Sequence, residues 1–90
     1  MKEVKVLSVC GMGFGTSLMV LMTIQDIGKK YDVKVTGEAC DLGSYKGKKC
    51  DFIVASSEIA SQIVGNQIDV VSIKNILDKK EIEEKVKNYF

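Results

Sequence analysis

The chain contains neither histidine nor arginine, so all 13 of its basic residues are lysines. Histidine is the usual general base and the commonest metal ligand, and arginine is the side chain that binds a phosphate with two parallel hydrogen bonds. Their absence excludes much of the chemistry that a small enzyme performs alone. We expect this protein to bind no metal and no cofactor.

Clusters of like charge and long apolar runs are also missing. The lysines are nearly balanced by 12 acidic residues, and no basic or acidic block indicates a surface for nucleic acid or anionic lipid. The opening MKEVKVLSV is too short and too charged for a signal peptide, and no run of about 18 apolar residues occurs. We therefore expect a cytoplasmic protein that binds no nucleic acid and is not inserted into a membrane.

The three cysteines, Cys10, Cys40 and Cys50, form neither a CxxC pair nor a metal-ligand spacing. An odd number of cysteines argues against a disulfide framework, and cytoplasmic thiols stay reduced. Because 90 residues are enough for one modest core, residues 1–90 are predicted to form a single domain.

Short apolar segments alternate with longer amphipathic ones along the chain. Four segments are predicted to be strands, at residues 4–9, 33–39, 51–55 and 68–73, and three to be helices, at 17–31, 56–64 and from about 78 onward. The strands are apolar throughout, which is typical of a parallel sheet covered on both faces. We expect a doubly wound, phosphatase-like α/β fold with a four-stranded parallel sheet in the order 2-1-3-4.

Apolar spacing and hydroxyl residues set the expected helix limits. Thr16 or Ser17 is expected to cap the first helix, and Ser56 and Ser57 to open the second. The predicted apolar positions of the first helix are Leu18, Leu21, Met22, Ile24, Ile27 and Tyr31, with Met19 beside them, and those of the last helix are Ile82, Val86 and Tyr89.

The stretch CGMGFGTS, residues 10–17, places a thiol before three glycines and two hydroxyl residues, between a predicted strand and a predicted helix. Free N–H groups at a helix start carry the positive end of the helix dipole, and glycines let the main chain wrap closely around a ligand. A loop of this size fits one tetrahedral oxyanion better than a dinucleotide. The pattern therefore predicts a phosphate site at the switch point of the sheet.

The same dipole acts on the thiol of Cys10. A helix start contributes up to about 2 kcal/mol, or roughly 1.5 pKa units, which would make about half of a free thiol ionised at neutral pH. A nucleophile beside a phosphate site is what a phosphocysteine intermediate requires. The alternative for Cys10 is a buried core thiol, and that is the reading we favour for Cys40 and Cys50.

The residues that this chain lacks indicate which reaction the thiol of Cys10 serves. A CxxxxxR phosphatase needs arginine six residues after its cysteine, where this chain has Thr16, and an acid to protonate the leaving group. A phosphohistidine donor needs no such acid, because imidazole leaves readily. The cysteine is therefore predicted to relay a phosphoryl group.

The segment CGMGFGTSLM, with a cysteine ending the first strand and a Gly-rich loop closing in Thr-Ser, resembles a known motif. It is similar to the phosphorylated-cysteine loop of IIB components of the bacterial phosphoenolpyruvate-dependent sugar phosphotransferase system (PTS). The stretches CDLGSYK (40–46) and ASSEIASQI (55–63) resemble the ascorbate-type branch, near the galactitol and lactose/cellobiose groups. The likeness spans nearly the whole chain.

The resemblance implies a phosphohistidine–sugar phosphotransferase that accepts phosphate from a IIA protein or domain. It implies transfer to a sugar, ascorbate by preference, held by the IIC membrane permease, and thus association with the inner face of the membrane through IIC. Cys10 matches the phosphorylated residue, and the phosphate-binding loop falls on Gly11, Met12, Gly13, Phe14, Gly15, Thr16 and Ser17. The missing histidine fits, since the donor histidine comes from the partner.

Other readings stay open at this point. Galactitol or a lactose/cellobiose-type sugar could replace ascorbate, and a low-molecular-weight phosphatase or arsenate-reductase-like enzyme could share the loop. A nucleotide-binding module is the third class, although Thr16 stands where a dinucleotide motif has its third glycine and only Glu38 is placed to contact a ribose. Met12 and Phe14 could form an apolar rim that docks partners, and lysines 46, 48 and 49 could steer an acidic one.

Overall fold

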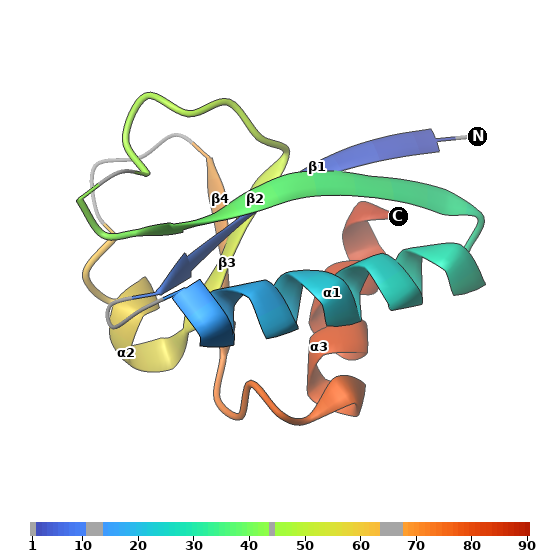
Figure 1. Cartoon of the computed structure of the whole chain (residues 1–90). Helices are drawn as coiled ribbons and strands as arrows, with labels where there is room; N and C mark the ends of the chain where they lie inside the picture. Colours follow the sequence, from blue (N-terminus) through green and yellow to red (C-terminus); the bar gives the residue numbers. More distant parts are fainter. Residues whose placement is uncertain (1, 11–13, 44, 64–67) are drawn as a thin grey trace.

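The structure is a computed structural model that describes residues 2–10, 14–43, 45–63 and 68–90. Figure 1 shows the elements in chain order. They are β1 (Lys2–Cys10), α1 (Phe14–Lys30), β2 (Val33–Asp41), β3 (Phe52–Ser56), α2 (Ser57–Ala60), β4 (Asp69–Ile73), α3 (Lys79–Val86) and a short 3-10 helix, η1 (Lys87–Tyr89).

The four strands form one parallel sheet in the order β2-β1-β3-β4, which confirms the predicted order. β1 pairs with β2 along its whole length, from Lys2 opposite Val33 to Cys10 opposite Asp41. This continuous pairing extends both strands beyond their apolar cores, so β1 begins and β2 ends two residues outside the predicted limits. Exposed ends of a strand have no apolar signal, and the sequence pattern therefore missed them.

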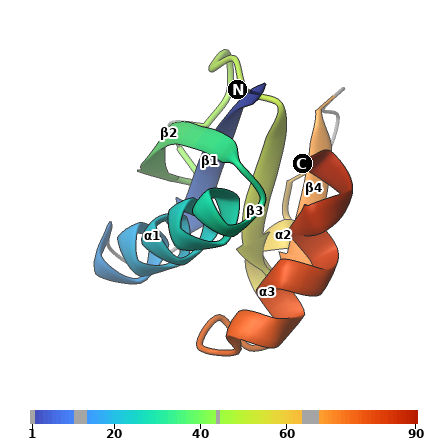
Figure 2. The ribbon, with the colours of Figure 1, turned by 90° about the vertical axis from the view of Figure 1, so that its right-hand side faces the viewer.

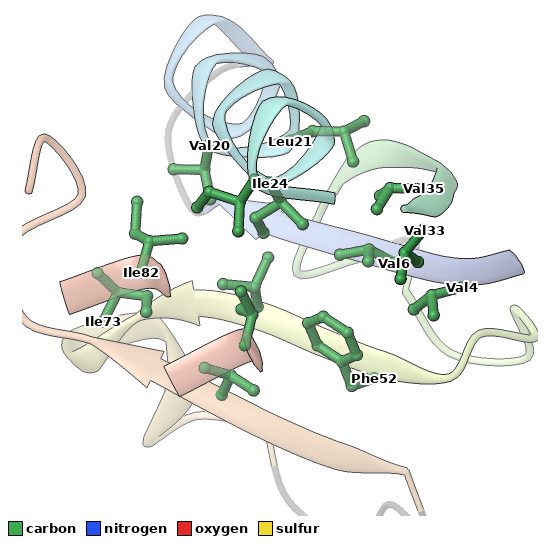
Figure 3. Close-up of a cluster of buried hydrophobic side chains, with 14 residues drawn as sticks. Val4, Val6, Val20, Leu21, Ile24, Val33, Val35, Phe52, Ile73 and Ile82 are labelled. Carbon is green, nitrogen blue, oxygen red and sulfur yellow. The ribbon is translucent and has the colours of Figure 1, made fainter. Parts of the chain in front are cut away.

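One face of the sheet carries the larger apolar cluster, and α1 and α3 lie side by side on it (Figure 2). Figure 3 shows side chains of α1, such as Ile24, and of α3, such as Ile82, meeting those of the strands. The buried strand residues of this cluster are Val4, Val6, Val33, Val35, Phe52, Val54, Val71 and Ile73. The valine-rich strands thus bury their apolar faces, as the sequence predicts.

The opposite face carries a second cluster built from the alternate strand residues. Leu7, Val9, Ile53 and Ala55 are buried there with Cys40, Tyr45 and Ile63, and Ile59 and Ala60 of α2 pack against them. Helices therefore lie on both faces of the sheet, which confirms the predicted α/β architecture. Within the described ranges, no helix combines the length and the apolar character needed to cross a membrane.

Helix α1 begins at Phe14, three residues before the predicted start at Ser17. Thr16 and Ser17 therefore lie inside the first turn, and their predicted role as N-cap residues is wrong. Packing against the sheet fixes this helix, and a glycine at position 15 costs little in a first turn whose N–H groups lack intrahelical partners anyway. Beyond Lys30 the chain turns at Asp32, which adopts a left-handed φ of 59°.

The buried face of α1 is narrower than its apolar pattern predicts. Leu21, Ile24 and Ile27 are buried, together with Val20. Leu18, Met19 and Met22 are 50, 55 and 56% exposed, so the prediction that they serve as helix packing is wrong. The reason is that this helix is apolar on more than the face that the sheet covers. Tyr31 is also exposed at its edge, where its hydroxyl donates to Glu83.

The two C-terminal helical segments differ in how they begin. Ser56 occupies the N-cap position of α2, but its side chain makes no capping hydrogen bond, so the predicted capping role is wrong in that respect. Helix α2 ends at Ala60, and the predicted helix residue Val64 lies outside the described residues, as does Ser44 in the stretch 40–46. The last helix begins close to the predicted residue 78, and Asp78 is its N-cap, because the Asp78 carboxylate accepts from the N–H groups of Lys80 and Glu81.

Candidate functional site

Cys10 is the last residue of β1, at the carboxyl edge of the sheet. The neighbouring strand on one side is β2, where Asp41 lies opposite Cys10. On the other side Val9 pairs with Ala55 of β3, which puts Ser56 at the level of Cys10, and Ser56 pairs with Ile73 of β4. The crossover from β1 leads to β2 on one side and the crossover from β3 leads to β4 on the other, so Cys10 stands at the predicted switch point.

The residues after Cys10 divide into two groups. Gly11, Met12 and Gly13 of the predicted phosphate-binding loop lie outside the described residues. The backbone from Phe14 to Ser17 forms the first turn of α1 instead of a loop. The first four N–H groups of an α-helix have no acceptor within the helix, so a helix start of this kind offers donors to an anion.

A groove of about 360 Å³ opens at the same edge of the sheet. Its lining comes from three separate parts of the chain: Met19 of α1, Ser56 at the end of β3, and residues 74–77 after β4. Sequence reasoning missed this groove as a whole, because its residues meet only through the sheet order. In the sequence Ser56 is expected only to open the second helix, and Lys74 carries no signal of its own.

Glu81 of α3 holds the segment after β4 in place. Its carboxylate accepts from the backbone N–H of Lys74 at 2.6 Å and of Asn75 at 2.9 Å, and it pairs with the ammonium of Lys85 at 2.9 Å. These contacts, the bond from Lys74 first, lower the pKa of Glu81 to about 2. The backbone of Lys74, one of the residues that line the groove, is therefore fixed.

The other two cysteines lie on the opposite face of the sheet from α1. Cys40 is buried in the second apolar cluster and Cys50 packs against it. Burial raises the pKa of both thiols, so neither is activated as a nucleophile. Their surroundings support the structural role predicted for them.

Two charged residues that were candidates for other functions, Glu38 for a nucleotide site and Lys48 for attracting an acidic partner, form an ion pair with each other. Glu38, the candidate ribose contact, pairs with Lys48 at 2.9 Å, which lowers the pKa of its carboxyl and removes support for a nucleotide site. Across the parts of the chain that the structure describes, no three histidine, cysteine or acidic side chains gather as a metal site would require.

Comparison with known proteins identifies the class to which this site belongs. Residues 5–88 match a family model described as "PTS system, Lactose/Cellobiose specific IIB subunit". The chain therefore belongs to the PTS IIB family. Membership of that family implies a phosphotransferase activity in sugar transport, in general with partners of the IIA and IIC kinds.

Two relatives narrow the comparison within the family. The chain is 35% identical to the ascorbate-specific PTS system EIIB component of Escherichia coli O157:H7, over 82% of this chain and 76% of the relative. It is 28% identical to the protein of the same description from Mycoplasma pneumoniae, over 92% of this chain and 90% of the relative.

A solved structure shares the fold. The lactose-specific IIB component domain from Streptococcus pneumoniae superposes with a TM-score of 0.66 and covers 98% of this chain and 95% of its own. Its sequence identity is 21%, so this likeness bears on the architecture alone. It supports the doubly wound α/β fold.

Proposed function

We propose that this protein carries a phosphoryl group on Cys10, from a phosphohistidine of a IIA protein to a sugar bound by a IIC permease. The observation that carries the proposal is the position of Cys10 at the end of the central strand, next to the start of α1. Family membership supplies the reaction class, and the position of Cys10 supplies the residue. We further propose that residues 1–90 act as one IIB unit.

The proposed site residues are those at the strand-to-helix connection. Cys10 is the nucleophile, and the main chain of Gly11, Met12, Gly13, Phe14, Gly15, Thr16 and Ser17 binds the phosphoryl oxygens. The start of α1 at Phe14 supports this, because its free N–H groups and dipole stabilise negative charge. The same charge stabilisation favours the thiolate of Cys10 over its thiol.

Transfer onto Cys10 requires no acid from this chain. The thiolate attacks phosphorus, the S–P bond forms, and the N–P bond of the phosphohistidine breaks. The leaving nitrogen takes the electron pair and becomes neutral imidazole when the other ring nitrogen already carries a proton. In the second step the S–P bond breaks, a sugar hydroxyl oxygen binds phosphorus, and the thiolate is regenerated, while a base of the permease takes the hydroxyl proton.

Ascorbate is the sugar that we propose. The support is the naming of the two relatives, which are both described as ascorbate-specific. A lactose/cellobiose-type sugar is the second candidate, because the family model carries that description. In either case the protein works in the cytoplasm and reaches the inner face of the membrane by binding IIC.

Intact-mass spectrometry tests the phosphocysteine. The wild-type protein is incubated with a phosphorylated IIA partner and is expected to gain one phosphoryl group in an iodine-sensitive linkage. Cys10→Ala should gain none, whereas Cys50→Ala, which removes a thiol from the other face of the sheet, should behave as wild type. An adduct that survives in Cys10→Ala, or its absence from the wild type, would contradict the proposal.

A further inference from the structure

Two residues that line the groove have polar side chains that stabilise no other described part of the fold. The hydroxyl of Ser56 does not cap α2. Neither this hydroxyl nor the ammonium of Lys74 has a hydrogen-bond or ion-pair partner among the described residues, and Ser56 and Lys74 are both lining residues of the groove, as is Met19. Both are donors, so the groove presents a cation and a hydroxyl to an anionic ligand.

The sheet register places these donors near Cys10. Cys10 lies level with Ser56 on β3, and Ser56 pairs with Ile73 on β4, directly before Lys74. Neighbouring strands are about 4.8 Å apart. Ser56 is therefore one strand away from Cys10, and Ile73 is two strands away, at a distance of about 10 Å. Met19 in the same groove belongs to the helix that begins four residues after Cys10. A lysine on a four-carbon stem spans much of this gap.

Among the described residues that line the groove, Lys74 is the one lysine. The ammonium groups of Lys30, Lys34, Lys48, Lys85 and Lys87 pair with glutamates, and that of Lys2 reaches the carbonyl of Phe90. Lys46 follows Tyr45, which is buried on the face opposite α1. Lys29 lies at the far end of α1, in its last turn. Because the chain has no arginine, a phosphoryl group here has no other type of side-chain cation available.

We propose that Lys74 and Ser56 bind the phosphoryl group of phosphorylated Cys10, with the Lys74 ammonium and the Ser56 hydroxyl as donors to its oxygens. This inference rests on the proposed function, since it requires phosphate on Cys10. A flexible lysine suits a relay, because its ammonium follows the phosphoryl group as it arrives and leaves.

The first test is the pH dependence of Cys10 alkylation, followed on the Cys10 peptide by mass spectrometry in the protein without any partner. Lys74→Gln should raise the pKa of Cys10 by about 0.5–1 unit, because a cation that stabilises the thiolate is removed. Lys74→Arg should restore the wild-type profile. The matched control Lys29→Gln removes an equally unpaired lysine at the other end of α1 and should leave the profile unchanged.

The second test is phosphoryl transfer from phosphorylated IIA. We expect Lys74→Gln to lower kcat/KM about tenfold and Ser56→Ala about threefold to tenfold, with thermal midpoints near that of the wild type. Wild-type rates in both variants, or equal losses in Lys74→Gln and Lys29→Gln, would overturn this inference while leaving the phosphocysteine intact. Failure of the wild type to form phosphocysteine would instead overturn the proposed function.

Discussion

Replacing Gly28 by alanine sets two opposing energies against each other. Gly28 is buried in the last turn of α1, where the helix packs on β2. In an open helix, alanine would stabilise the protein by about 1 kcal/mol over glycine. Here an added Cβ would stand 2.5 Å from Cγ2 of Val35 and 2.9 Å from the carbonyl oxygen of Val33. Both contacts are shorter than real Cβ atoms tolerate.

The crowding should outweigh the helix preference. Val35 is buried and cannot turn away freely, and the Val33 oxygen belongs to the main chain of a paired strand, so α1 itself must move off the sheet. Overpacking of this kind costs about 1–3 kcal/mol. We therefore expect a net loss of about 1 kcal/mol in the free energy of unfolding, with the sign as the decisive result.

Urea unfolding followed by circular dichroism measures this change, with Gly43→Ala as the control. A Cβ at Gly43 would meet only a carboxylate oxygen of Asp41 at 3.5 Å, so that variant should stay within about 0.5 kcal/mol of the wild type. Combining Gly28→Ala with Val35→Ala should show favourable coupling of about 1 kcal/mol, since the crowded methyl is gone. A Gly28→Ala protein more stable than the wild type would refute the reasoning.

Three further changes test other parts of the structure. Because the folded protein lowers the pKa of Glu81 from 4.5 to about 2, its carboxylate stabilises the fold above pH 4.5, and this stabilisation is lost as the pH falls toward 2. The stability difference between wild type and Glu81→Gln should shrink over that range in acid unfolding, and a difference independent of pH would argue against the contact. Gly37→Ala should unfold at least about 2 kcal/mol more easily in urea, because Gly37 has φ +147° and its Cβ would overlap the main-chain oxygen of Val6; near-wild-type stability would disprove that close approach. Met22→Ser should change stability by less than about 0.5 kcal/mol, since this side chain is 56% exposed, and a large loss would show that it is buried.

Much of the fold could be predicted because the strands differ clearly from the helices in the sequence. The apolar runs of β1 and β3 are buried on both faces, so their composition alone indicates a parallel sheet. The residues at which the helices begin and end were harder to predict from the sequence. Gly15 lies inside α1, although glycine usually signals a loop, because tertiary packing decides where that helix begins.

One part of the candidate site could be predicted from the sequence and another part could not. Cys10 could be predicted because one short segment holds the thiol, the glycines and the strand-to-helix change. The groove could not, because Met19, Ser56 and Lys74 are far apart in the chain and each looks ordinary alone. The apolar spacing in the sequence also did not show which side chains of α1 are exposed to solvent. Leu18 and Met22 have helical apolar spacing, but they lie beyond the face of α1 that the sheet covers.

A single-turnover chase tests the central claim, that Cys10 relays a phosphoryl group, most directly. The protein is phosphorylated by IIA, freed of donor, and mixed with membranes that contain the IIC permease and ascorbate. We expect phosphate to leave Cys10 as fast as the phosphorylated sugar appears, and only when sugar and permease are both present. Release as inorganic phosphate, or sugar phosphorylation by Cys10→Ala at the wild-type rate, would contradict it.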